Sequence, residues 1–331
     1  MICLSPAEFI HFGTTRELRQ LVTQDVQNYE FLDWNMKVNS AAVGDDYASH
    51  NAYVGRRTAV GEGVYIENAY AIGYSVIEPG AVLSHVRICD RHVPENTVLH
   101  GIQMSDGRYV VRIYGVEDNP KEKYPAGVHF LGSTLELMMQ KNGIEPSDLW
   151  DDEETYLWFA RLYPVCASHE EALDAAAVLY RIAQGTASPE EIRKWKASER
   201  VSLYSSFNSA DIVAAYRWEN ELENRVLTKK FVWALEAGNY YQEALEIFGK
   251  RGISEEMFRI LKQDAQEADF SLKIRIYYAL SRYMKYTGSS YKTMQYDALE
   301  TACFGTIQKA IYNSAKKNLP NSSGYRIFRN Q

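Results

Sequence analysis

The sequence predicts an α+β multidomain protein in which a parallel β-helix is followed by an all-helical domain. Aliphatic residues recur every five or six positions between residues 54 and 98, a period that neither an amphipathic helix nor a hairpin strand produces. From about residue 130 the pattern changes to helix caps and to apolar residues spaced by three and four. A chain of 331 residues is long enough to build more than one core.

The first region, residues 1–40, holds a short strand, a glycine and a helix in the run EFIHFGTTREL. Ile10 and Phe12 flank His11 in an alternating pattern that is typical of a strand. Thr14 and Glu17 have the spacing of a capping box, in which the side chains satisfy amide groups at the start of a helix. We therefore predict a helix that begins beside Thr14.

The second region, residues 41–116, is the most regular part of the chain. Its period is carried by nine aliphatic residues: Val54, Val60, Ile66, Ile72, Ile77, Leu83, Ile88, Val93 and Val98. A six-residue period is typical of a parallel β-helix, in which short strands turn corners and stack aliphatic side chains in one inner column. The pattern resembles that of the left-handed hexapeptide-repeat proteins, whose handedness is an exception to the right-handed crossover rule.

The repeat breaks after Gly101. The following run GRYVVRIYGV, residues 107–116, alternates as a last strand or hairpin arm does. Such an arm would cover the open end of the β-helix, whose unpaired edge is otherwise a liability. We expect the β-helix to end there.

The third region, residues 117–331, is predicted to be an α-helical domain. Ser133 is expected to open a helix that Gly143 ends, and Ser254 precedes two acids in a first turn. Ser168 with Glu171, and Ser188-Pro189 with Glu191, have the spacing of capping boxes. The tyrosines that crowd this region and the β-helix are expected to pack with their hydroxyl groups in water.

Composition narrows the class of protein. A formal net charge of −7 argues against a general nucleic-acid binder, which would show a basic face. No run approaches the roughly 20 apolar residues of a membrane span, and the N-terminus lacks the features of a signal peptide. The four cysteines are far apart, which fits reduced thiols. We expect a cytoplasmic protein with no nucleic-acid or membrane partner.

Three segments resemble a known family. EFIHFGTTREL, VLHGIQMSDGRYVVRIYGVEDNPK and LWFARLYPV are similar to segments of the fucose-1-phosphate guanylyltransferase (GDP-fucose pyrophosphorylase) family, above all of its bifunctional form fused to an L-fucokinase. Their order and their placement around a hexapeptide β-helix match that family too. The resemblance covers about residues 1–200 well and the remainder loosely.

The resemblance implies a fucose-salvage enzyme. Such an enzyme phosphorylates L-fucose with ATP and then joins fucose 1-phosphate to GTP, and Mg²⁺ bridges phosphate oxygens in both steps. The chain contains neither GxxxxGK[ST] nor GxGxxG, and only ten residues precede His11. We therefore expect a central piece that lacks both complete active sites, with residues 1–40 the end of a nucleotidyltransferase domain. Its partners would be the absent nucleotidyltransferase and kinase domains, and it would itself hold no cofactor and no metal.

The candidate substrate-binding residues lie in the first region: His11, Gly13, Thr14, Thr15 and Glu17. Amide and hydroxyl groups at a helix N-terminus favour anions, and the resemblance implies that this segment contacts the sugar or phosphate of fucose 1-phosphate. The alternative is a simple helix cap. No residue is assigned a catalytic role.

Two other functions are open. Many hexapeptide β-helix proteins are acyltransferases with a histidine as general base, and this chain offers five candidates: His11, His50, His85, His92 and His100. No partner acid for them is evident in the sequence, and histidines on the outer face of a coil are common. The chain could also be a pure scaffold or homo-oligomerisation module. Asp118, Asn119 and Lys121 fit either an ion site or a turn.

Overall fold

The computed structural model describes residues 14–23, 47–151, 154–249 and 252–287. The chain separates into two compact units, Met1–Val226 and Leu227–Gln331. Each unit has its own hydrophobic core among the described residues. The division into residues 1–40, 41–116 and 117–331 stays a prediction.

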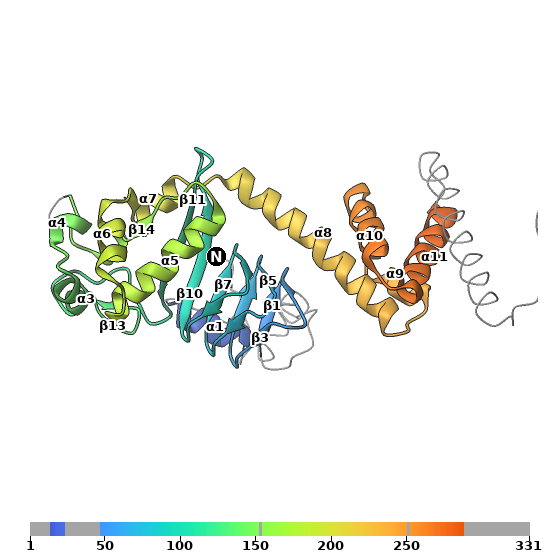
Figure 1. The fold of residues 1–331 in the computed structure, drawn as a ribbon, viewed down its shortest axis with the longest axis horizontal. Helices are drawn as coiled ribbons and strands as arrows, with labels where there is room; N and C mark the ends of the chain where they lie inside the picture. Colours follow the sequence, from blue (N-terminus) through green and yellow to red (C-terminus); the bar gives the residue numbers. More distant parts are fainter. Residues whose placement is uncertain (1–13, 24–46, 152–153, 250–251, 288–331) are drawn as a thin grey trace, which may run out of the picture. The chain divides into compact units, whose positions relative to one another are not determined.

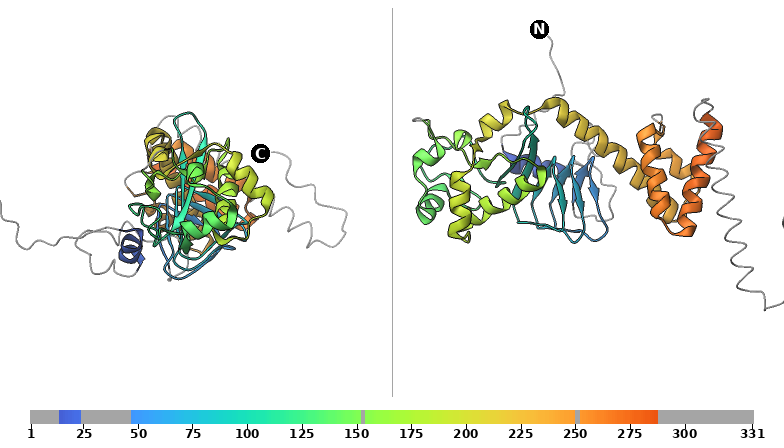
Figure 2. Two further views of the ribbon diagram at one scale, coloured as in Figure 1. Left: turned by 90° about the vertical axis from the view of Figure 1, so that its left-hand side faces the viewer. Right: turned by 45° about the horizontal axis from the view of Figure 1, so that its top comes forward.

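A β-solenoid of about three turns forms one side of the first unit (Figures 1 and 2). Its coils give three parallel sheets, in the orders β1-β4-β7-β10, β2-β5-β8 and β3-β6-β9. Tyr65 pairs with Ala48 and Val82 with Tyr65, so one coil takes 17 residues. The strands are β1 Ala48–His50, β2 Tyr53–Val54, β3 Ala59–Val60, β4 Tyr65–Glu67, β5 Tyr70–Ile72, β6 Val76–Ile77, β7 Val82–Ser84, β8 Arg87–Cys89 and β9 His92–Val93.

Most of the residues that carry the period point into the solenoid. Ile66, Leu83 and Ile88 are fully buried, and Val54, Ile77 and Val93 belong to the same core. Two positions of the predicted column are wrong by one residue. Ala71 pairs with Val54 and takes the inner place expected of Ile72, while Leu99 pairs with Leu83 and takes the place expected of Val98. Successive side chains of a strand point to opposite faces, so an error of one residue moves a side chain from the inside to the outside.

Each coil turns at corners that need left-handed backbone. Asn51, Asn68 and His85 occupy the same corner of successive coils, with φ angles of 45°, 44° and 53°. Asparagine and histidine are among the residues that tolerate this conformation best. The Asn51 amide nitrogen donates to the Asn68 side-chain oxygen at 2.8 Å, which begins a ladder along the corner. His85 continues that row in the last coil.

The helix predicted beside Thr14 is confirmed as α1, Thr15–Thr23, which packs on the outside of the solenoid. Its Val22 is buried against Tyr65, Val82 and Val98, which explains why Val98 faces outward. The Arg19 guanidinium donates to the carbonyl of Gly80 at 3.1 Å, a contact that ties α1 to a corner of the second coil. The apolar side of α1 thus covers one outer face of the solenoid.

The last coil is closed by a hairpin. Strand β10, Thr97–Gln103, pairs in parallel with β7 on one side and antiparallel with β11, Tyr109–Gly115, on the other. The predicted hairpin arm at residues 107–116 is confirmed. In Figure 1 these two strands stand between the coils and helices α3 to α7.

Short helices and strands pack against β11. Their hydrophobic residues join those of the solenoid in one core that runs from Ala52 to Leu203. The elements are β12 His129–Phe130, β13 Ser133–Thr134, α3 Leu135–Asn142, α4 Pro146–Leu149, η2 Leu157–Phe159, β14 Tyr163–Pro164, α5 His169–Gln184, α6 Pro189–Ala197, β15 Arg200–Val201 and α7 Leu203–Asn208.

The helix caps are mostly those that the sequence predicts. Ser188 and Glu191 form a capping box on α6, and Gly143 ends α3 in left-handed conformation. Ser168 caps α5, although the Glu171 carboxylate accepts from the amide of Ala167 and not from that of Ser168. The predicted start of α3 is wrong by one residue, because Ser133 pairs in β13 and Thr134 supplies the cap.

The second unit is helical where it is described. Helix α8, Ile212–Glu236, crosses the boundary between the units, and the second core is completed by α9 Tyr241–Glu246, α10 Glu255–Glu267 and α11 Phe270–Thr287. Ser254 caps α10 with two acids in the first turn, as predicted. Among the described helices, none combines the length and the apolar character that crossing a membrane requires.

Candidate functional site

The predicted substrate segment is partly described. Thr14 Oγ1 accepts from the Glu17 amide at 3.2 Å, and the Glu17 carboxylate accepts from the Thr14 amide at 3.0 Å, so the capping box is formed. Thr15 makes a side-chain hydrogen bond with Tyr114. What this helix start offers a ligand is therefore its first-turn amides more than its side chains. His11 and Gly13 lie outside the described residues.

The five histidines considered for acyl transfer do not gather at one place. His50 is exposed, and the exposed His92 lies 2.9 Å from Glu78 Oε1. That hydrogen bond is the main reason why the pKa of Glu78 is lowered. His85 and His100 do lie together, with ring centroids 5.7 Å apart, while His11 lies outside the described residues.

His85 and His100 line a cavity of about 630 Å³ at the closed end of the solenoid. We call it the end cavity. Its walls come from the β10–β11 hairpin, the N-terminus of α5, the segment after α7 and the first turns of α8, and all its lining residues belong to the first unit. Its main polar and aromatic residues are His85, His100, Arg112, His169, Trp218 and Glu219.

Arg112 is the buried charge of the end cavity. It pairs with His100 in the β10–β11 ladder, and its side chain is 8% exposed. Its Nη2 donates to His100 Nδ1 at 2.5 Å, while its Nε has no hydrogen-bond partner among the described residues. Burial lowers the pKa of this guanidinium, because a charge is costly to remove from water.

His100 is held in its neutral form. Burial lowers its pKa well below the usual value, and the charges of Arg112 and His85 lower it further. Because Nδ1 accepts from Arg112, the ring hydrogen sits on Nε2, which leaves that nitrogen as a donor. The pair Arg112–His100 thus presents donors only.

His85 is fixed by a chain of hydrogen bonds. Ser84 Oγ donates to Glu67 Oε1 at 2.7 Å and lies 3.0 Å from His85 Nδ1, and His85 Nε2 lies 3.1 Å from Glu219 Oε1. Since the Ser84 hydrogen is committed to Glu67, Ser84 Oγ is left as the acceptor towards His85 Nδ1. Ser84 is 6% exposed, so these residues anchor α8 to the last coil and do not act as a hydrolytic triad.

The acids around the end cavity are occupied. Glu219 is bonded to His85, and Glu170 pairs with Arg91 Nη2 at 2.8 Å. Asp211 Oδ1 accepts from the Ala214 amide and so caps α8. Within the described part of the chain, Arg112 has no carboxylate partner, and it contributes uncompensated positive charge.

Aromatic rings form one wall. The His169 ring stacks on Trp218 with centroids 6.0 Å apart and meets Tyr109 edge-on at 6.3 Å. The Trp218 indole donates to the carbonyl of Asn68 at 2.7 Å, which fixes its plane. Burial lowers the pKa of His169, so this ring favours its neutral form. The cavity therefore combines a positive end with a flat, largely apolar side.

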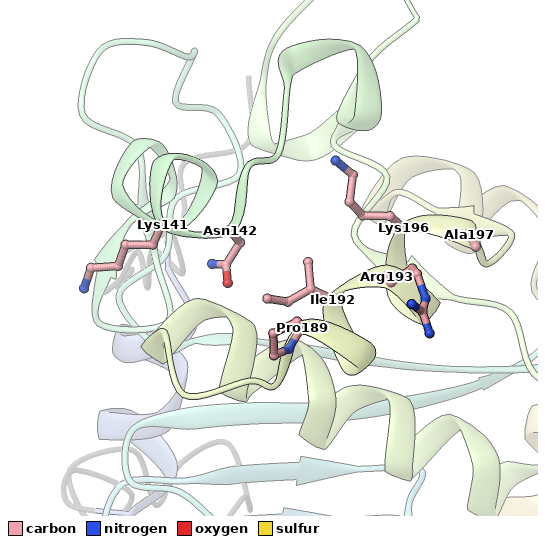
Figure 3. Close-up of a pocket in the computed structure, with 7 residues that line it drawn as sticks. All are labelled: Lys141, Asn142, Pro189, Ile192, Arg193, Lys196 and Ala197. Carbon is pink, nitrogen blue, oxygen red and sulfur yellow. The ribbon is translucent and has the colours of Figure 1, made fainter.

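A second hollow, of about 600 Å³, lies between α3 and α6. Three cations surround it, but Figure 3 shows Lys141 and Arg193 pointing away from the space between the helices. Arg193 is bonded to Glu190, and Lys196 to Asp148 and the carbonyl of Gly143. This hollow is open, and it presents no buried unpaired charge among the described residues.

Several other polar and aromatic residues have structural roles. The Asp118 carboxylate accepts from the amides of Gly115 and Leu131, which favours the turn over an ion site. Trp150 and Tyr163 are buried in the core, and Trp158 packs against it. Among the described residues, no three His, Cys, Asp or Glu side chains come together as metal ligands, and Cys89 and Cys166 are free thiols.

Sequence reasoning missed most of the end cavity. Arg112 lies inside the segment RYVVRIYG, where it reads as one outward position of a strand, and His169 and Glu219 carried no signal at all. The one sequence feature that could have indicated the cavity is Arg112 itself, a basic residue within an otherwise apolar strand, because a charge is rarely buried without a reason.

Comparison with known proteins gives the family. A family model for the fucose pyrophosphorylase domain matches residues 1–168, which is half of the chain. The chain belongs to the fucose pyrophosphorylase domain family. This confirms the family that the three sequence segments predict. The matched part contains α1, the whole solenoid and Arg112, and it ends just before His169.

A curated relative has both activities in its name. The bifunctional fucokinase/GDP-fucose pyrophosphorylase of Arabidopsis thaliana is 26% identical over 218 residues, which are 61% of this chain and 20% of the relative. The chain thus spans about a fifth of the length of the curated relative that it matches. No solved structure matches it.

Proposed function

We propose that this chain works in fucose salvage, in the step that joins fucose 1-phosphate to GTP and releases pyrophosphate. The observation that carries the proposal is the match of the fucose pyrophosphorylase domain to residues 1–168. The name of the Arabidopsis relative adds the phosphorylation of L-fucose by ATP, which we assign to the larger enzyme of which this chain would be a part.

Within that reaction we propose a supporting role for this chain. Helix α1 would close the sugar side of the active site, with Thr15 and the neighbouring first-turn amides facing the phosphate of fucose 1-phosphate. Thr14 and Glu17 would shape that helix start, because their side chains cap it. His11 and Gly13 complete the proposed segment.

The nucleotide and its metal would be held elsewhere. The chain contains neither GxxxxGK[ST] nor GxGxxG, and the described residues offer no cluster of metal ligands. Magnesium would arrive on the phosphates of GTP or ATP, where it neutralises their charge. Separate nucleotidyltransferase and kinase domains would be the partners of this chain.

The solenoid would act as a rigid spacer, with its flat faces available for contact with a second copy. We propose that its coils are left-handed and of the hexapeptide class. In support, 17 residues divided among three sides give just under six residues a side. A crystal structure with right-handed coils would contradict this, and a strict monomer at high concentration would contradict the contact between copies.

The substrate role can be tested on the purified chain by amide NMR. Fucose 1-phosphate should shift the Thr15 and Arg16 amide signals, while unphosphorylated L-fucose and GTP should leave them in place. Thr15→Pro removes one of these amides at a helix position that tolerates proline, and it should weaken the response. Thr23→Val at the other end of the same helix is the control. Absence of any shift at α1 would contradict the proposal that this helix contacts fucose 1-phosphate.

The supporting role has its own test. The purified chain with fucose 1-phosphate, GTP and Mg²⁺ should form no GDP-fucose. Formation of GDP-fucose above a no-protein control would show a complete active site and overturn the proposal that the nucleotide is held elsewhere.

A further inference from the structure

The end cavity contains a cation whose charge nothing described neutralises. Arg112 is 92% buried, because its exposed fraction is 8%, and its Nε has no partner among the described residues. An uncompensated buried charge costs several kcal/mol, and natural proteins rarely keep one without a ligand or a partner. The acids nearby cannot serve, since Glu219 and Glu170 are bonded to His85 and Arg91.

A second feature points to an anion. Helix α5 has 16 residues, and its N-cap Ser168 and its first residues His169 and Glu170 lie on the wall of the same cavity. The amides of a helix N-terminus carry partial positive charge that adds to the field of Arg112. The first turn also carries two acids, of which Glu170 is neutralised by Arg91 and Glu171 accepts from the Ala167 amide. His100 contributes a neutral ring with a donor at Nε2.

The rest of the wall suits the body of a small organic molecule. The Trp218 ring is fixed by its hydrogen bond to the Asn68 carbonyl and stacks on His169, which Tyr109 meets edge-on. The exposed Tyr216 stands at the rim. The volume of about 630 Å³ lies within the usual range of small-molecule sites, about 300–1,000 Å³.

We propose that the end cavity binds a small organic phosphate. The phosphate group is bonded by the Arg112 guanidinium and by His100 Nε2–H near the start of α5, and the organic part lies against Trp218. A phosphate carries about 1.5 to 2 negative charges at neutral pH, which suits a buried guanidinium better than the single charge of a carboxylate does. This site is separate from the start of α1.

The experiment uses the purified chain with glucose 6-phosphate as the probe, and the Trp218 indole N–H signal in NMR reports binding. The probe should shift that signal in a saturable way. Arg112→Met should weaken binding by about thirtyfold or more, because it removes the buried charge. Arg193→Met, the same change at the exposed arginine of the hollow between α3 and α6, should alter it by less than about twofold.

One stability measurement and one further variant distinguish a loss of binding from misfolding. Arg112→Met should unfold at the same temperature as the wild type or higher, since it replaces an unpaired buried charge by an apolar side chain of similar length. Ala215→Leu fills the cavity from the surface of α8 and leaves every charge in place, and it should weaken binding by about tenfold.

Several results would overturn the proposal. If glucose 6-phosphate does not shift the Trp218 signal, or if Arg112→Met binds it as well as the wild type does, the end cavity is not the proposed phosphate site. Equal affinity for glucuronate would contradict the preference for phosphate. Severe destabilisation of Arg112→Met would mean that the guanidinium is a structural group. The probe contains neither fucose nor guanine and is read at Trp218, so its outcome is distinct from that of the guanylyltransferase proposal.

Discussion

The first coils of the solenoid and its closed end use the same backbone for different purposes. In the first coils the shared corner holds Asn51 and Asn68, which bond to each other, and the inner column is apolar. In the last coil the same corner holds His85, which bonds to Glu219 on a helix 134 residues later in the chain. All three corners contact α8, since the Asn51 amide also donates to the Glu219 carbonyl and the Asn68 carbonyl accepts from the Trp218 indole. The difference is the residue type: of these three corners, the last one has a histidine in place of asparagine, and this ring meets the Glu219 carboxylate and lines the end cavity.

The largest effect should come from the inner column, which the coils share. Leu83→Ala removes a fully buried side chain that stacks between Ile66 and Leu99, and it should lower the free energy of unfolding by about 4 kcal/mol. Urea denaturation measures this. Val76→Ala, at an outward position that is 42% exposed, is the control and should cost less than about 1 kcal/mol. Equal losses would mean that the column is not the core.

Next comes the tight contact at the closed end. A Cβ atom on Gly101 would lie 2.2 Å from the backbone oxygen of His85, so Gly101→Ala should destabilise the protein by about 3 kcal/mol. Gly63→Ala meets no atom within 4 Å and carries only the strain of its left-handed backbone, about 1 kcal/mol. Thermal unfolding measures the loss of stability in the two variants. A smaller loss in Gly101→Ala than in Gly63→Ala would show that the coils can separate at Gly101.

The closed end should also respond to pH. Burial raises the pKa of Asp118 to about 6, although its hydrogen bonds to the Leu131 and Gly115 amides lower it. The folded protein therefore binds more protons than the unfolded chain between pH 4 and pH 6, so this residue makes stability fall as pH rises through that window, by about 2–3 kcal/mol. Urea unfolding at several pH values measures the slope. Asp118→Asn should flatten it, and an unchanged slope would exclude Asp118 as its source.

The smallest effect should come from the corner itself. His85→Asn restores the residue type of the first coils, and asparagine tolerates the left-handed backbone. The loss of the partly exposed contact between His85 Nε2 and the Glu219 carboxylate should cost about 1 kcal/mol or less. Asn68→His is the reciprocal change for comparison. If His85→Asn costs far more than about 1 kcal/mol, His85 supports the end of the solenoid as well as the cavity.

The sequence predicts the coils well and the end cavity poorly, for one physical reason. The repeat is local, so five- and six-residue steps reveal it, and its errors at Ile72 and Val98 arise where a corner shifts the alternation by one residue. Caps such as Thr14 with Glu17 are local too. By contrast Arg112, His169 and Glu219 meet only after the chain has folded, and no spacing between them signals this contact.

The 17-residue pairing step has a practical consequence for changing the size of this protein. A second copy of residues 48–64 inserted before Ala48 would form one more rung, raising the stack by about 4.8 Å. The contacts of α1 and α8 with later coils would keep their present partners. The number of coils in the solenoid and the residues of the end cavity can therefore be varied separately.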